Sequence, residues 1–176
     1  MYRFISAFII LLLIFSCSPK KLTPEEIAKA KTEIESIANA YNKGIIDKDT
    51  KATMDLFSQS PYLQIIGTDS AEVFKSLEKF KSHLEVDWEL LTVSKVYDIR
   101  NVAIQISEDG TLASILYESP WDLTIANQMM HAILRFSWTL IKEDNQWKIV
   151  QGMGQFASVG QSSEELLAQM KSEKGK

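Results

Sequence analysis

The chain of 176 residues is poor in residue types that build covalent or metal-centred sites: it has one cysteine, Cys17, and two histidines, His83 and His131. A single cysteine excludes an intramolecular disulfide and a cysteine-based zinc site. The two histidines are far apart in sequence and show no His-x-x-x-His spacing, so we expect no metal and no cofactor. The formal net charge of −4 argues against a nucleic-acid partner.

The chain also lacks an apolar run long enough to cross a membrane. The longest run, residues 4–15, falls short of the roughly 20 residues that a spanning helix needs. Arg3 precedes it and polar residues follow it, which is typical of a secretory signal. The segment Ile14-Phe15-Ser16-Cys17 resembles the lipobox of bacterial lipoproteins. An uncleaved anchor or an ordinary signal is the alternative.

The lipobox resemblance implies a protein of the bacterial cell envelope. Its signal would be removed before Cys17, and the sulfur of Cys17 would carry a lipid anchor. In such proteins the anchor consists of diacylglycerol and palmitate. The membrane partner would then be reached through lipidated Cys17, which could not serve as a catalytic thiol. The sequence leaves open which membrane and leaflet hold the anchor.

The spacing of apolar residues predicts a helical N-terminal part. A first helix begins after Thr23, which can cap it, and weakens near Gly44. A second, shorter helix covers residues 47–57, and a strand covers residues 62–67. A third helix follows a cap at residues 68–70 and buries one apolar face. This face comprises Val73, Leu77, Phe80 and Leu84.

From residue 86 the apolar period changes to two, which predicts strands. They cover residues 86–95, 102–106, 112–118, 133–142 and 147–153, and a short helix follows at the C-terminus. The connecting segment 119–130 is a lid, a contact surface or an extension of the hairpin. Helices followed by a meander of strands indicate an α+β fold, with the helices covering one face of a curved antiparallel sheet.

Residues 135–151 form a strand, a tight acidic turn and a second strand that begins Trp147-Lys148-Ile149-Val150. This segment, with Ile65-Ile66-Gly67-Thr68-Asp69, resembles the SnoaL-like branch of the nuclear-transport-factor-2-like (NTF2-like) superfamily. The resemblance covers about residues 25–157. It implies a cone in which three N-terminal helices pack on a strongly curved antiparallel sheet around a cavity, with a short C-terminal helix.

Together, the lipobox and SnoaL-like resemblances predict four parts. Residues 1–16 would be a signal peptide, 17–22 a lipidated tether, 23–160 a SnoaL-like domain, and 161–176 a C-terminal helix and tail. Members of this superfamily include isomerases, dehydratases and cyclases, but also ligand-binding modules and dimers. The fold therefore does not define the function.

Catalytic candidates are few. SnoaL-like relatives often carry a histidine after the last strand, whereas Gly154 or Gln155 stands near that place here. This departure argues against inherited catalysis. The remaining candidates for acid–base chemistry are Glu118, Asp122 and His131. We interpret His83 as a structural residue near the end of a helix.

Ligand-binding candidates come from the polar and aromatic residues of the strands. Arg135 lies on a strand whose opposite face is wholly apolar. If Arg135 faces the cavity it could hold a carboxylate or phosphate of a ligand. The alternative is a cross-strand pair with Glu118 or Asp122. The full set of ligand-binding candidates is Arg135, Trp138, Tyr117, Trp88 and Gln151.

Three hypotheses for the function follow. The first is a membrane-anchored, non-catalytic lipoprotein that binds a small apolar molecule or a protein partner in or beside the cone. The second is an acid–base enzyme of the isomerase, dehydratase or cyclase kind, and the third is a structural module that forms a homodimer. Convergence of Arg135 and a carboxylate in one apolar pocket would favour the enzyme. A pocket occupied by Phe136, Trp138 and Met153 would argue against it.

Overall fold

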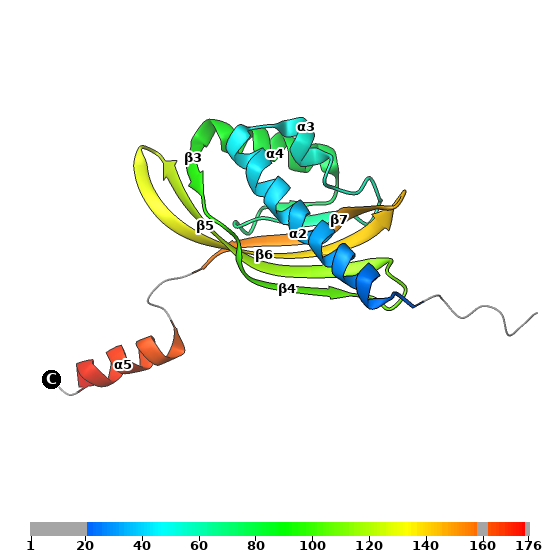
Figure 1. The fold of residues 1–176 in the computed structure, drawn as a ribbon. Coiled ribbons are helices and arrows are strands. Elements are labelled where there is room, and N and C mark those ends of the chain that lie inside the picture. Colours follow the sequence, from blue (N-terminus) through cyan, green and yellow to red (C-terminus); the bar gives the residue numbers. More distant parts are fainter. Residues whose placement is uncertain (1–20, 158–161, 175–176) are drawn as a thin grey trace, which may run out of the picture.

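The computed structural model describes residues 21–157 and 162–174 (Figure 1). Cys17 and the rest of the expected signal and anchor lie outside this part, so the lipoprotein assignment stays a prediction. Among the described residues, no helix combines the length and apolar character required to cross a membrane.

Seven strands form one curved sheet in the order β2-β1-β7-β6-β5-β3, and β4 pairs with a second stretch of β5. The strands are β1 (Gln64–Ile66), β2 (Val73–Phe74), β3 (Leu91–Val96), β4 (Arg100–Ile106), β5 (Leu112–Ile125), β6 (Gln128–Glu143) and β7 (Gln146–Phe156). All neighbours are antiparallel except β1 and β7, which run parallel. The expectation of a purely antiparallel sheet is therefore wrong. No hairpin joins β1 to β7, so no short connection constrains their relative direction.

The described residues contain four helices, α2 (Pro24–Asp47), α3 (Thr50–Met54), α4 (Leu77–Leu90) and α5 (Ser163–Lys174). Thr23 and Glu26 form a capping box at the start of α2, as predicted. The helix continues past Gly44, where the missing Cβ lets α2 pack closely against the side chain of Thr53. It ends at Asp47, and the cap Lys48 has a left-handed backbone with φ 54°.

The predicted limits of the third helix are wrong at both ends. Residues 73–74 form β2, and α4 begins only at Leu77 after its cap Ser76. The helix then runs through residues that were expected to be a strand and ends at Leu90. Phe80, Leu84 and Trp88 lie four residues apart and are all buried, so the apolar residues keep the helical spacing as far as Trp88. Over residues 86–90 a short alternation of apolar and polar residues also fits a strand, which explains the wrong prediction.

The segment 119–130 is an extension of the hairpin. β5 pairs with β6 along its whole length, from Leu112 opposite Ile141 to Ile125 opposite Gln128. Ala126 and Asn127 form the two-residue turn with φ of 49° and 65°. The other edge of β5 pairs first with β4 and then, beyond Pro120, with β3. The chain thus builds one long, bent ribbon.

Helices α2 and α4 lie over the concave face of this ribbon (Figure 1). Alternate residues of β5 point inward and are buried, including Ile115, Tyr117 and Leu123. Tyr41 from α2 packs edge-on against Trp138, with ring centroids 4.8 Å apart. The result is an α+β fold with a helical N-terminal part, a curved mixed sheet and a short C-terminal helix.

Candidate functional site

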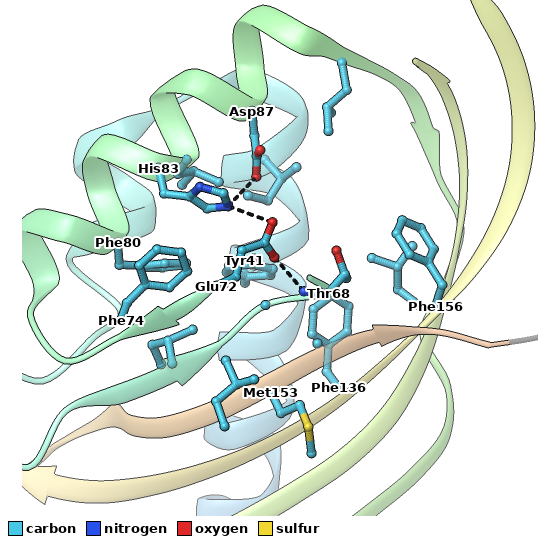
Figure 2. Close-up of a pocket in the computed structure, with 18 of the residues that line it drawn as sticks. Tyr41, Thr68, Glu72, Phe74, Phe80, His83, Asp87, Phe136, Met153 and Phe156 are labelled. Carbon is cyan, nitrogen blue, oxygen red and sulfur yellow. Dashed lines mark hydrogen bonds and ion pairs between the residues drawn. The ribbon is translucent and has the colours of Figure 1, made fainter. Parts of the chain in front are cut away.

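A cavity of about 140 Å³ lies between α4, α2 and the concave face of the sheet. An engineered apolar cavity of about 150 Å³ is known to hold benzene, so this space fits one small ring. Most of its lining is apolar or aromatic (Figure 2). The aromatic members of the lining are Tyr41, Phe57, Phe74, Phe80, Trp88, Trp121, Phe136, Trp138 and Phe156.

One wall of the cavity carries three ionisable side chains, Glu72, His83 and Asp87 (Figure 2). The Nε2 atom of His83 lies 3.4 Å from Oε1 of Glu72 and 3.4 Å from Oδ2 of Asp87. His83 and Asp87 are four residues apart on α4, which places them on the same side of the helix. We call these three residues the acidic wall.

Glu72 is held in place by the loop before β2. Its Oε2 atom accepts hydrogen bonds from the backbone N–H groups of Thr68 at 2.7 Å and Asp69 at 3.0 Å. Two amide donors stabilise negative charge on this carboxylate. Its other oxygen, Oε1, faces His83. The loop therefore fixes the carboxylate of Glu72 in its place within the acidic wall.

Asp87 is the perturbed group of this wall. Burial raises the pKa of its carboxyl above the ordinary value; His83 opposes this shift and the charge of Glu72 adds to it. Tyr41 lines the same cavity, and burial, followed by the charge of Asp87, raises the pKa of its phenol. A carboxyl with a raised pKa beside an imidazole is suited to exchange a proton with a bound molecule.

Trp88 and Trp138, two of the predicted ligand-binding residues, line the cavity. Trp88 is buried, and its indole Nε1 has no hydrogen-bond partner in the described part of the chain. Tyr117 does not line this cavity. It is buried, stacks on Phe136 with ring centroids 5.0 Å apart, and lines a separate pocket together with Glu118 and Arg135. Gln151 lines a separate, shallow depression of the sheet.

Arg135 points away from the cavity, on the convex face of the sheet. Its Nε donates to Oε1 of Glu118 at 2.9 Å, and Arg100 and Asn101 donate to Oε2 at 3.2 and 2.8 Å. The hydrogen bond from Arg135 lowers the pKa of Glu118, with Asn101 and Arg100 contributing. Arg135 is thus half of a cross-strand ion pair, the alternative considered from sequence, and does not face a ligand in the cavity.

Asp122 and His131 also lie on the convex face, because the inward positions beside Asp122 belong to Trp121 and Leu123. Oδ1 of Asp122 is 2.7 Å from Nδ1 of His131, and Oδ2 accepts the hydroxyl of Tyr97 at 2.7 Å. The hydrogen bond to His131, then that from Tyr97, lowers the pKa of Asp122. The three catalytic candidates, Glu118, Asp122 and His131, therefore do not converge on the cavity.

The place of the expected histidine is filled from the neighbouring strand. Gly154 pairs with Phe136, and a Cβ atom at position 154 would lie 3.0 Å from the ring of Phe136. Gly152 pairs with Trp138 in the same way, with 2.8 Å between such a Cβ and the indole. The two glycines make room for large rings. The ionisable groups that line the cavity come instead from α4, the loop before β2 and, with Tyr41, α2.

Sequence reasoning missed the acidic wall. The spacing His83-x-x-x-Asp87 indicates that the two side chains lie one turn apart on the same helix, provided that the helix is known to reach Leu90. Glu72 carried no signal, since its position depends on the fold of a loop. In the described part of the chain, no group of three or more histidine, cysteine, aspartate or glutamate side chains is arranged to hold a metal ion.

Comparison with solved structures places the fold among NTF2-like proteins. An NTF2-like protein of unknown function from Pseudomonas putida KT2440 is 12% identical with a TM-score of 0.61, covering 76% of this chain and 91% of that chain. A ketosteroid isomerase-like protein from Erwinia carotovora atroseptica SCRI1043 is 14% identical with a TM-score of 0.62, covering 73% and 96%. A candidate scytalone dehydratase from Novosphingobium aromaticivorans DSM 12444 is 14% identical with a TM-score of 0.65, covering 77% and 89%.

These identities are low, so the similarities establish the fold alone. Among curated proteins, none matches the chain. The sequence model of the SnoaL-like domain matches residues 34–157, which span α2 from Ile34 onward, both other helices of the N-terminal part and every strand. The chain therefore belongs to the SnoaL-like domain family of the NTF2-like fold.

Proposed function

We propose that the domain binds a small, largely apolar molecule in the cavity between α4 and the sheet. The observation that carries the proposal is the cavity itself, with its volume of about 140 Å³ and its aromatic lining. Pockets for small molecules are concave and mostly apolar, with a few polar groups that fix orientation. The acidic wall supplies such groups on one side.

The binding proposal is tested by native mass spectrometry of the full-length chain, purified from its source in lipid nanodiscs. We expect a retained small molecule. The variant Leu91→Trp adds bulk to a half-buried lining residue and should lose that mass. Leu116→Trp makes the same change at an exposed position on the convex face and should retain it. An empty wild-type chain would contradict the proposal.

A second function, acid–base catalysis on the bound molecule, is favoured by the convergence of Glu72, His83 and Asp87 at one wall. In such chemistry a proton is taken from the substrate and returned to it. The retained molecule incubated with the protein in D₂O should therefore gain deuterium at carbon. The double variant His83→Ala/Asp87→Asn should abolish this gain, and absence of exchange in the wild type would leave a binding protein.

We also propose that the domain is anchored in the cell envelope through lipidated Cys17, for which the lipobox resemblance is the support. Cys17→Ser should release the protein from membranes and abolish labelling by a palmitate analogue. Unchanged labelling would exclude the anchor. This part of the proposal is independent of what the cavity holds.

A further inference from the structure

The charge of the cavity is the feature that selects its ligand. The acidic wall contains two carboxylates and one imidazole, and the described lining contains no lysine or arginine. Counted with a neutral imidazole and two ionised carboxyls, the wall carries two negative charges. One proton added at any of the three groups leaves one unit of negative charge, which faces a mostly apolar space.

Neighbouring elements do not cancel this charge. Tyr41 of α2 faces the site, and burial and the charge of Asp87 keep its phenol protonated by raising its pKa. The nearby cation is Lys48, whose ammonium group donates to the backbone oxygen of Trp88. Lys48 itself does not line the cavity.

In the described part of the chain, Oε2 of Glu72 is the one carboxylate oxygen of the wall that accepts well-formed hydrogen bonds. One ring N–H of His83 lies 3.4 Å from both, and a single N–H cannot donate well to two acceptors. Glu72 uses Oε2 for two backbone amides, whereas Asp87 accepts no hydrogen bond in the described part of the chain. An ammonium group carries three donors and a positive charge, and so supplies what the wall lacks.

The remaining walls favour the same kind of group. Aromatic faces attract cations and also accommodate an apolar body, and the lining contains Tyr41, Phe74, Trp88 and Phe136. An anion would be repelled by the carboxylates, and a neutral molecule would leave their net charge unbalanced. We propose that the cavity takes a small hydrophobic amine, bound as an ammonium cation with its nitrogen at Glu72 and Asp87. This inference rests on the proposed binding function and names its ligand class.

Three ring compounds of nearly equal size test the inference: benzylamine, benzyl alcohol and benzoate. Binding to the full-length chain in nanodiscs is measured by calorimetry at pH 7. We expect benzylamine to bind about tenfold or more tightly than benzyl alcohol, and benzoate to bind more weakly still. Asp87→Asn and Glu72→Gln should remove the preference for benzylamine and keep the affinity for benzyl alcohol, which shows that the variants are folded.

The matched control is Glu118→Gln, which removes a carboxylate from the convex face and should leave the preference intact. Equal or tighter binding of benzyl alcohol or benzoate by the wild type would overturn the cationic ligand and leave apolar binding standing. Failure of all three compounds to bind would also overturn it. The proposed binding function is tested separately, and an empty source-purified chain is the result that would contradict it.

Discussion

Two aspartates show how position alone sets the behaviour of one residue type. Asp87 faces the cavity, where burial dominates and raises its pKa. Asp122 faces solvent on the convex side, where His131 and Tyr97 donate to it and lower its pKa. A group in a cavity that is charged at a cost in the folded state is a candidate for function, because stability alone does not favour it.

Asp87→Asn is expected to stabilise the fold at pH 7. The folded pKa of Asp87 lies above the unfolded value of about 3.9, so the native state binds more protons and stability falls as pH rises through that window. Glu72, His83 and Tyr41 face this group. Urea unfolding should show no advantage of the variant below pH ~4, and an advantage that grows to a plateau above the folded pKa. A loss of stability at pH 7 would contradict the dominance of burial.

Asp122→Asn should act in the opposite direction. Its folded pKa lies below the unfolded value, so the ionised carboxylate stabilises the native state above the unfolded pKa. This stability is lost as pH falls through the folded pKa. The same urea titration should show a less stable variant at pH 7 and a shrinking difference toward acid pH. A pH-independent difference would assign the effect to packing.

Sequence reasoning identified the aromatic residues of the cavity better than its polar ones. Trp88 and Trp138 face the interior because large rings in a half-buried strand or helix have few other places to go. The sequence does not show which face of a strand points into the cavity. The assignment of Arg135, Glu118 and Asp122 to ligand binding or acid–base chemistry was therefore made without that information. The face is set by packing of the whole sheet, and a polar strand face more often looks to solvent than to a cavity.

At the level of elements, turn chemistry decided which hairpin could be predicted. Asp109-Gly110 marks the β4–β5 turn, and Gly110 has the positive φ of 70° that such turns require. The β5–β6 turn places Ala126 and Asn127 at positive φ, and alanine gives no signal for it. The sequence therefore does not distinguish a lid, a contact surface and an extended hairpin over residues 119–130. The length of the hairpin is instead determined by pairing of β5 with β6.

Ala126→Gly is expected to stabilise the protein by about 0.5–1 kcal/mol. A left-handed alanine costs about 1–2 kcal/mol, which the glycine relieves. The greater freedom of glycine in the unfolded chain offsets about 0.5–1 kcal/mol of this stabilisation. Chemical denaturation measures the change in the free energy of unfolding.

The matched control for this turn variant is Ala28→Gly, an exposed position within the regular helix α2. Without positive φ to relieve, the control should lose about 1 kcal/mol. Destabilisation by both variants to the same extent would mean that the β5–β6 turn is not strained at Ala126.

At the scale of the whole molecule, the described chain has a packed part and an appended helix. The helices α2 and α4 and the curved sheet enclose the cavity, whereas α5 is drawn away from them (Figure 1). Every side chain described for residues 162–172 is exposed. The family match ends at residue 157, one residue after β7. Composition and periodicity predicted α5 but not whether it packs, because exposed leucines are common on protein surfaces.

A chain shortened to end at residue 157 should keep the melting temperature of the full chain within about 2 °C, because it loses no buried side chain that the structure describes. A chain that ends at residue 152 is the contrast. It loses Met153, which pairs with Ile66 of β1, and Gly154, which pairs with Phe136 of β6. Without these residues β1 loses part of its parallel partner and the cavity loses one wall. Calorimetry should show a lower and broader transition for this second chain, and equal losses in both chains would mean that α5 belongs to the packed part.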